Sequence, residues 1–153
     1  MANLSSGLAG VSGEYYVCAE LSHRGYIATL TLKNTEGIDI LATRLGLGRS
    51  ISIQVKTTQQ NDGKWLLTKK SEENNVVDFY IFVCLGELGQ RPSFHIVSSK
   101  DVSISIKKTH IKWLSGSKRD GTQRKDTPMR GFSDKENKFL EQWELLDAPP
   151  SKS

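Results

Sequence analysis

The order of predicted elements indicates an α/β fold in which helices flank a central mixed β-sheet. A helical segment comes first, several strand-like segments follow, and further helical patterns end the chain. The strongest strand is residues 78–85, an almost unbroken apolar run typical of a strand buried on both faces. The 153 residues suffice for a single domain with its own core, which we expect to span residues 1–153 with the ordered part at about 12–147.

The chain before residue 98 predicts one helix and several short strands. Small and apolar side chains recur at helical spacing near the N-terminus, with Gly25 as a stop signal. Alternation of apolar and polar residues then predicts half-buried strands, with Gly-containing turns between them. The expected elements are a helix at 13–25, strands at 26–33, 37–42, 50–56, 65–68, 78–85 and 94–97, and turns or loops at 34–37, 46–48, 57–63 and 86–92.

Two signals for the start of a helix lie in the second half of the chain. Ser98 and Asp101 have the spacing of a capping box, which predicts a helix ending at Trp113. Residues 102–106 also alternate as a strand would, so both alternatives stay open. A second capping box precedes apolar residues at helical spacing and predicts a C-terminal helix. The residues of this second pattern are Ser133, Glu136, Phe139, Leu140, Trp143 and Leu146.

One motif joins an aspartate on one predicted strand to a Gln-Val-Lys triplet on the next. In residues 37–42 the apolar side chains share a face, and Asp39 points the other way. In residues 50–56 the apolar side chains again share a face, and Gln54 and Lys56 point the other way. Pairing the two strands with both apolar faces on the core gathers the three polar side chains on one side. A carboxylate, an amide oxygen and an ammonium group held together can bind a divalent metal and a phosphate.

This pattern resembles that of the PD-(D/E)XK nuclease superfamily, which includes restriction endonucleases and Holliday-junction resolvases. In that superfamily an Asp on one strand precedes an acid-any-lysine triplet on the next. Asp39 matches the first position and Lys56 the last. Gln54 stands where an acid is commoner, although glutamine occurs in some branches, so the chain resembles a QxK variant. The resemblance implies a restriction-endonuclease-like (tRNA-endonuclease-like) three-layer sandwich over about residues 12–147.

A glutamate on the first helix adds a fourth candidate. In resolvase-like members a glutamate lies at the start of this helix, about three turns before a Gly-aromatic pair, and Glu14 has that relation to Gly25-Tyr26. Glu20 lies six residues further on, roughly 240° around the helix, so both acids cannot face one cleft. The resemblance therefore favours Glu14 as a metal ligand. The alternative is that Glu14 only favours the positive N-terminus of its helix.

The resemblance implies hydrolysis of DNA phosphodiester bonds with the help of Mg²⁺ or Mn²⁺. Asp39 would anchor the ion, with further ligands from Glu14, the Gln54 side-chain oxygen and the Val55 carbonyl. Lys56 would orient the attacking water and stabilise the developing charge. Asp78, which opens a predicted strand, is a lesser candidate for an acid that supports the site.

Three functions stay open at this point. The first is a metal-dependent DNA endonuclease of resolvase or restriction type. The second is a catalytically weak or inactive nucleic-acid-binding module on the same fold, because a neutral amide at Gln54 binds Mg²⁺ less strongly than a carboxylate. The third is an interaction protein that uses the fold only as a scaffold. For an enzyme that cuts both strands we expect a symmetric homodimer formed through an exposed apolar patch, since the domain has one site.

Positive charge is concentrated near the C-terminal third. Residues 107–135 hold nine Lys or Arg and three Asp, whereas the rest of the chain has a net charge of −2. Residues 115–128 consist largely of Gly, Ser, Thr and charged residues, which is typical of a mobile loop. Such a loop can close over a phosphate backbone, or it can simply be a solvated surface. The candidate nucleic-acid-binding residues are Lys118, Arg119, Arg124, Lys125 and Arg130.

The remaining features argue against other classes. No apolar stretch approaches the length of a membrane span, and the N-terminus has no basic-then-apolar signal sequence. Cys18 and Cys84 are expected to be buried thiols of a reducing compartment rather than a disulfide. We therefore expect a cytoplasmic protein without a membrane partner. No metal spacing is formed by the histidines His23, His95 and His110.

Overall fold

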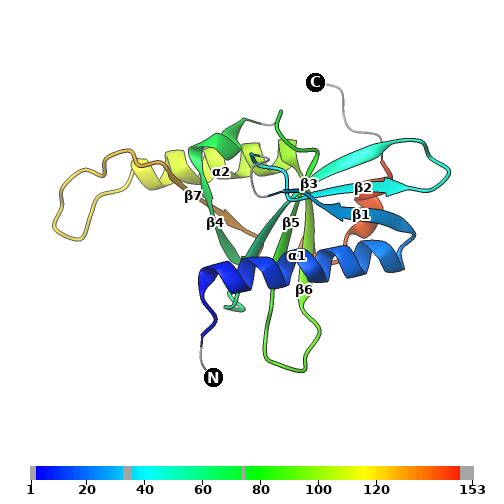
Figure 1. Ribbon diagram of the computed structural model, residues 1–153. Helices are drawn as coiled ribbons and strands as arrows, with labels where there is room; N and C mark the ends of the chain where they lie inside the picture. Colours follow the sequence, from blue (N-terminus) through cyan, green and yellow to red (C-terminus); the bar gives the residue numbers. More distant parts are fainter. Residues whose placement is uncertain (1–2, 33–35, 74, 149–153) are drawn as a thin grey trace.

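A five-stranded mixed sheet forms the centre of the computed structural model, with strands in the order β1-β2-β3-β5-β6 (Figure 1). Strands β3 and β5 run parallel, and every other neighbouring pair is antiparallel. The structure describes residues 3–32, 36–73 and 75–148. Its elements are α1 (Ser6–His23), β1 (Tyr26–Leu30), β2 (Ile40–Arg44), β3 (Ser50–Thr58), β4 (Lys64–Thr68), the 3₁₀ helix η1 (Lys69–Glu72), β5 (Phe79–Cys84), β6 (Ser93–Ser98), α2 (Ser99–Leu114), β7 (Met129–Ser133) and the 3₁₀ helix η2 (Trp143–Asp147).

Strand β5 separates two hydrophobic cores. All six of its residues are buried, as expected for a strand covered on both faces. Ile81 and Val83 pack in one core with residues of α1. Tyr80 and Phe82 pack in the other core with α2 and a small two-stranded sheet of β4 and β7. The chain is thus the α/β sandwich that the sequence predicts, with α1 on one face of the sheet and α2 with β4 and β7 on the other.

Both main helices begin at a serine that caps the backbone. Helix α1 begins at Ser6 rather than at the predicted residue 13, because the Ser5 hydroxyl accepts a hydrogen bond from the Leu8 N–H at 3.3 Å. Helix α2 follows Ser98, whose hydroxyl accepts from the Asp101 N–H at 3.1 Å. The capping signal therefore decides between the two alternatives for residues 102–106, which are helical.

The predicted C-terminal helix is wrong. Ser133 instead ends strand β7, which pairs with β4 and which the sequence analysis missed. The Asp134 carboxylate then accepts the N–H groups of Lys138 and Phe139 at 2.8 and 2.9 Å, which closes a turn rather than opening a helix. The Phe139 carbonyl accepts from the backbone of β6, so pairing with a strand edge replaces helical hydrogen bonding. Only the short η2 remains of the expected helix. Of the turn expected at 34–37, residues 34 and 35 lie outside the described residues.

Gly13 sets how closely α1 approaches the sheet. A Cβ at this position would overlap the Thr57 hydroxyl and lie 3.0 Å from the Thr57 Cβ. We predict that Gly13→Ala destabilises the protein by about 1–3 kcal/mol, because α1 must move away from β3. Gly10→Ala is the matched control, since nothing lies within 4 Å of its Cβ position. That variant should gain about 0.5–1 kcal/mol from helix propensity.

Urea denaturation of the two variants and the wild type measures both effects. Adding Thr57→Ala to Gly13→Ala should restore part of the lost stability, because it removes the hydroxyl and methyl groups that crowd the helix. Equal stabilisation by both glycine substitutions would show that α1 does not depend on this contact.

Candidate functional site

Asp39 lies where strands β2 and β3 separate. Their pairing ends at Ile40 opposite Ile53, so the expected strand at 37–42 begins later than predicted. The Asp39 N–H donates to the Ile53 carbonyl at 2.9 Å. One carboxylate oxygen, Oδ2, accepts the Val55 N–H at 2.7 Å. The side chain therefore takes over the hydrogen bonding of β3 where β2 turns away, and this fixes the carboxylate beside the strand.

Gln54 and Lys56 lie on the face of β3 that is turned away from α1. The intervening residue Val55 is buried in the core beneath α1, whereas Gln54 and Lys56 are half-buried. Their partners across the parallel pairing are Tyr80 and Phe82, which belong to the core on the α2 side. The two polar side chains predicted to share a face therefore do so.

Asp39 interacts electrostatically with residues of this face. Burial raises the pKa of the Asp39 carboxyl, and the Val55 N–H and the Lys56 charge oppose that shift. Burial also raises the pKa of the Tyr80 hydroxyl, where a hydrogen bond with Ser71 opposes the shift and the Asp39 charge adds to it. Asp39 thus interacts with both Lys56 and Tyr80 at the point where β2 and β3 separate.

Glu14 lies in the middle of α1, not at its start. Because the helix begins at Ser6, Glu14 is too far along for its N-terminal dipole to matter, which removes the alternative considered for this residue. The adjacent Gly13 packs against Thr57, in the part of β3 that has no β2 partner. Glu14 is half-buried, and its charge helps to raise the pKa of Cys18, although burial of that thiol is the larger cause.

Glu20 has a different role. Its carboxylate forms ion pairs with Arg24 at 3.2 Å and Arg91 at 2.9 Å. Arg91 also binds Glu141, so these residues tie the end of α1 to the C-terminal segment. The structure therefore gives Glu20 a stabilising role and leaves Glu14 as the acid of α1 beside the open part of β3.

Asp78 organises the start of the parallel pair. Its carboxylate oxygen Oδ2 accepts from the Ser52 N–H at 2.8 Å and from the Ser52 hydroxyl at 3.1 Å. The Asp78 N–H donates in turn to the Ser52 carbonyl at 3.0 Å. Ser52 precedes Gln54 by two residues on β3. By binding Ser52, Asp78 fixes the register of β3 against β5 and so helps to position Gln54.

A groove leads away from Lys56 across the α2 side of the molecule. It has a volume of about 580 Å³ and lies between the end of β3, the small sheet and α2. A neighbouring hollow of about 280 Å³ shares Leu66, Thr109 and Gly131 with it and continues to Trp113 and Arg130. The two hollows connect Lys56 with the base of the basic loop that follows α2.

The five candidate nucleic-acid-binding residues do not behave alike. Lys118, Arg119 and Lys125 are exposed on the loop. Arg124 is half-buried, donates to the Trp113 carbonyl at 2.8 Å and lies 5.0 Å from the centroid of the Trp113 ring. Arg130 was expected to contact nucleic acid, but this expectation requires correction. Its side chain is 2% exposed and is bound to Glu72, so it anchors the loop instead.

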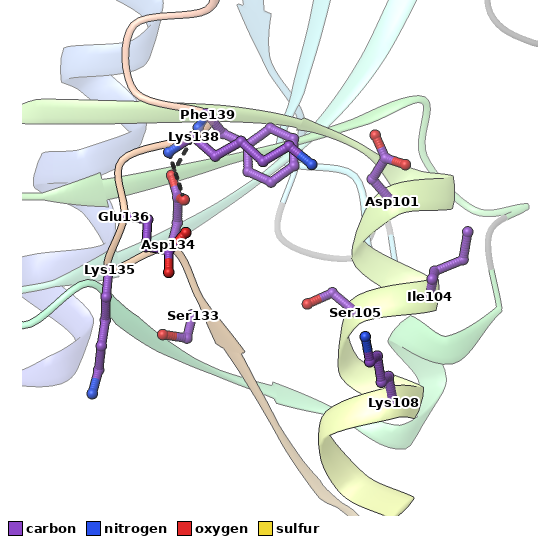
Figure 2. A pocket seen from close by; sticks show the side chains of 10 residues that line it. All are labelled: Asp101, Ile104, Ser105, Lys108, Ser133, Asp134, Lys135, Glu136, Lys138 and Phe139. Atoms are coloured by element: carbon purple, nitrogen blue, oxygen red, sulfur yellow. Dashed lines mark hydrogen bonds between the residues drawn. The ribbon is translucent and has the colours of Figure 1, made fainter. Parts of the chain in front are cut away.

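A further depression lies between α2 and the turn after β7 (Figure 2). Figure 2 shows the Asp134 carboxylate accepting from the backbone N–H groups of Lys138 and Phe139. The same carboxylate is 2.7 Å from His95 Nδ1, in a pair that is almost fully buried. Because its oxygens are already engaged in holding the turn, this depression is a structural feature rather than a reaction site.

The expected ligands are atoms that suit a hard divalent cation. The described residues contain no group of three or more His, Cys, Asp or Glu side chains placed to hold a metal. The expected set is different, since it combines two carboxylates with an amide and a carbonyl, all of them oxygen donors of the kind Mg²⁺ prefers. A partly buried carboxylate whose pKa is raised by burial would also be stabilised by a nearby cation.

Comparison with solved structures shows the same fold in two nucleases. The bacterial homing endonuclease I-Ssp6803I superposes with a TM-score of 0.57 and 16% identity, over 93% of this chain and 91% of its own. Hjc, a Holliday junction resolvase from Archaeoglobus fulgidus, superposes with a TM-score of 0.51 and 11% identity, over 90% and 93%. The chain therefore has the restriction-endonuclease-like fold. No protein-family model and no curated protein sequence matches it.

In the described part of the chain, no helix is long and apolar enough to cross a membrane.

The raised pKa of Asp39 predicts how the stability of the protein changes with pH. Since the folded-state pKa lies above the ordinary value, stability falls as pH rises through the interval between the two, and the ionised carboxylate destabilises the protein at neutral pH. Asp39→Asn keeps an oxygen that can accept the Val55 N–H but cannot ionise. We predict that this variant melts at a higher temperature than the wild type at pH 7.

The gain should shrink as the pH is lowered through the raised pKa and vanish below about 3.9, the ordinary value for Asp, where both side chains are neutral. Thermal melts at several pH values measure it. A wild type that melts at a higher temperature than Asp39→Asn at pH 7 would contradict the raised pKa of Asp39. So would a difference in melting temperature that is the same at every pH.

Proposed function

We propose that this protein is a metal-dependent DNA endonuclease of the resolvase or restriction type. The observation that supports it best is the fork between β2 and β3. There the Asp39 carboxylate is held 2.7 Å from the Val55 N–H and interacts electrostatically with Lys56. A fixed carboxylate that can hold a metal ion, next to a lysine that can stabilise charge on a phosphate, can support phosphodiester hydrolysis.

Each residue then has a defined task. Asp39 is the principal ligand of Mg²⁺ or Mn²⁺, and the Gln54 amide oxygen, the Val55 carbonyl and Glu14 complete the protein's share of the ligands. The bound ion would act as a Lewis acid on the scissile phosphate. Lys56 holds the attacking water and stabilises the charge that develops on the phosphate oxygens. Tyr80, coupled to Asp39 and buried, closes one side of the site.

The fold neighbours support DNA as the partner. One is a homing endonuclease and the other a Holliday junction resolvase. At 16% and 11% identity they share the fold with this chain, and the substrate comes to it only by analogy. The exposed Lys118, Arg119 and Lys125 and the groove from Lys56 are suited to a polyanion. We propose that the protein acts on DNA in the cytoplasm.

A symmetric homodimer is part of this proposal, because cutting both strands of a duplex requires two sites. Apolar side chains are available for it on the outer surface of α1, where Leu8, Val11 and Tyr15 are exposed.

A second function is favoured by one residue. Gln54 replaces an acid with a neutral amide, which lowers the negative charge of the site by one and weakens its hold on a cation. The same fold would then serve as a nucleic-acid-binding module with little or no activity.

Two substitutions, Asp39→Ala and Lys125→Ala, separate catalysis from DNA binding. Asp39→Ala should lose cleavage at least about 100-fold, while it binds DNA as well as the wild type or better, because a charge that repels phosphate is gone. Lys125→Ala should weaken binding of all sequences alike and reduce the salt slope by about one, because it removes one phosphate contact. Cleavage assays with Mg²⁺ and Mn²⁺ and mobility-shift titrations measure the two properties.

Duplex, branched and single-stranded DNA should all be tested as substrates. If wild type cleaves none of them with either metal, the enzyme is excluded and the binding module takes its place. If Lys125→Ala leaves binding unchanged as well, the phosphate contact of Lys125 is excluded.

A further inference from the structure

The loop between α2 and β7, expected to be mobile, closes into a hairpin at its tip. The Gly121 N–H donates to the Lys118 carbonyl at 3.0 Å, and the Lys118 N–H donates to the Thr122 carbonyl at 2.8 Å. The tight turn ends at Gly121, whose φ of +81° lies in the left-handed region, as is common in three-residue hairpin loops. A β-bridge between Ser117 and Gln123 continues the pairing below the turn. We call residues 115–128 the finger.

The base of the finger is fixed to α2. The Arg124 guanidinium lies over the Trp113 ring, and on α2 the His110 ring stacks with the same ring at 5.6 Å. His110 Nε2 is 2.7 Å from the Asp126 carboxylate. Arg130 in β7 donates to the Thr127 carbonyl at the end of the finger and pairs with Glu72. Figure 1 shows the finger extending away from the body of the domain beyond the end of α2. The finger is therefore a preformed projection.

The acids of the finger are used within the protein, whereas its remaining cations point outward. The Asp120 carboxylate accepts from the N–H and hydroxyl of Thr122, and these bonds lower its pKa. The pKa of Asp126 is lowered mainly by its bond with His110. In the described part of the chain, no hydrogen bond or ion pair engages the side chains of Lys118, Arg119 and Lys125. Arg119 stands inside the tip turn, at its second residue.

We propose that the finger enters the major groove of duplex DNA and that Arg119 at its tip reads the edge of a guanine. The proposal rests on the proposed function only in taking DNA as the partner. The major groove, about 12 Å wide, admits a two-stranded β-ribbon. The tip of the finger, two segments joined by the Ser117–Gln123 bridge, is a short hairpin narrow enough to enter the same groove. Arginine pairs bidentately with the O6 and N7 atoms of guanine, which is the commonest specific contact in that groove. Because the tip turn is already formed, binding need not pay for ordering its backbone.

The geometry distinguishes Arg119 from Lys125. Lys125 lies near the base of the finger, beside residues bound to α2, where a backbone phosphate at the groove edge is within the reach of its side chain. A phosphate contact adds affinity to every sequence, whereas a base contact changes which sequence is preferred. Lys125, a cation of the same loop, is therefore the matched control for Arg119.

Binding is measured with the full chain in EDTA, so that cleavage plays no part. A pool of duplexes with a random central region is fractionated by mobility shift, and the bound fraction is sequenced. The wild type should prefer guanine at a defined position, and 7-deazaguanine there should weaken its binding by about 5- to 150-fold. Arg119→Ala should lose this preference and become insensitive to 7-deazaguanine. Lys125→Ala should bind more weakly but keep the preference.

Arg119→Lys keeps the positive charge but lacks the planar fork of donors, so it should retain most of the affinity and show a weaker guanine preference than the wild type. The proposal is overturned if Arg119→Ala weakens all sequences equally and so keeps the wild-type preference, or if the wild type shows no base preference. These results are independent of cleavage. A protein that prefers guanine through Arg119 but never cleaves DNA contradicts only the proposed function, and one that cleaves without the preference contradicts only the finger.

Discussion

The hydrogen bond from the Val55 N–H to the Asp39 carboxylate is the interaction on which the candidate site depends. It lies where β2 leaves β3, so the side chain replaces a strand that is no longer there. The carboxylate is held in a partly buried position, which raises its pKa and makes it a good partner for a cation. The parallel pairing of β3 with β5, fixed by Asp78, then aligns Gln54 and Lys56 on the same face.

Much of the fold was predictable because short-range signals agreed with the tertiary structure. The apolar run at 78–85 predicted a strand covered on both faces, and β5 is that strand. The capping signal at Ser98 predicted α2, whose buried Val102 and Ile106 lie one turn apart. The capping signal at Ser133 failed because Asp134 and the edge of β6 compete for the same backbone groups. Strand β7 was missed because its partner β4 is distant in sequence, and such pairing leaves no local signal.

In the candidate site, too, features set by local sequence were predictable and features set by distant residues were not. Alternation along one strand was enough to place Gln54 and Lys56 on one face, and the structure has them there. Whether Arg130 is free to bind a partner was not predictable, because its burial depends on Glu72, far away in sequence. The composition of the finger predicts a mobile loop, whereas its tip is a hydrogen-bonded turn closed by Gly121. Asp120 and Gly121 are common turn residues, but composition alone does not show which backbone groups they pair.

In the proposed function, Asp39 and Gln54 together hold a divalent cation next to Lys56. A crystal of the full chain soaked in Mn²⁺, with the ion located by its anomalous scattering, tests this directly. We expect a peak between the Asp39 carboxylate and the Gln54 amide oxygen, at about 2.0–2.4 Å from each, and its loss in Asp39→Ala crystals. Mn²⁺ bound only elsewhere on the protein, or at the same place in the Asp39→Ala variant, would contradict it.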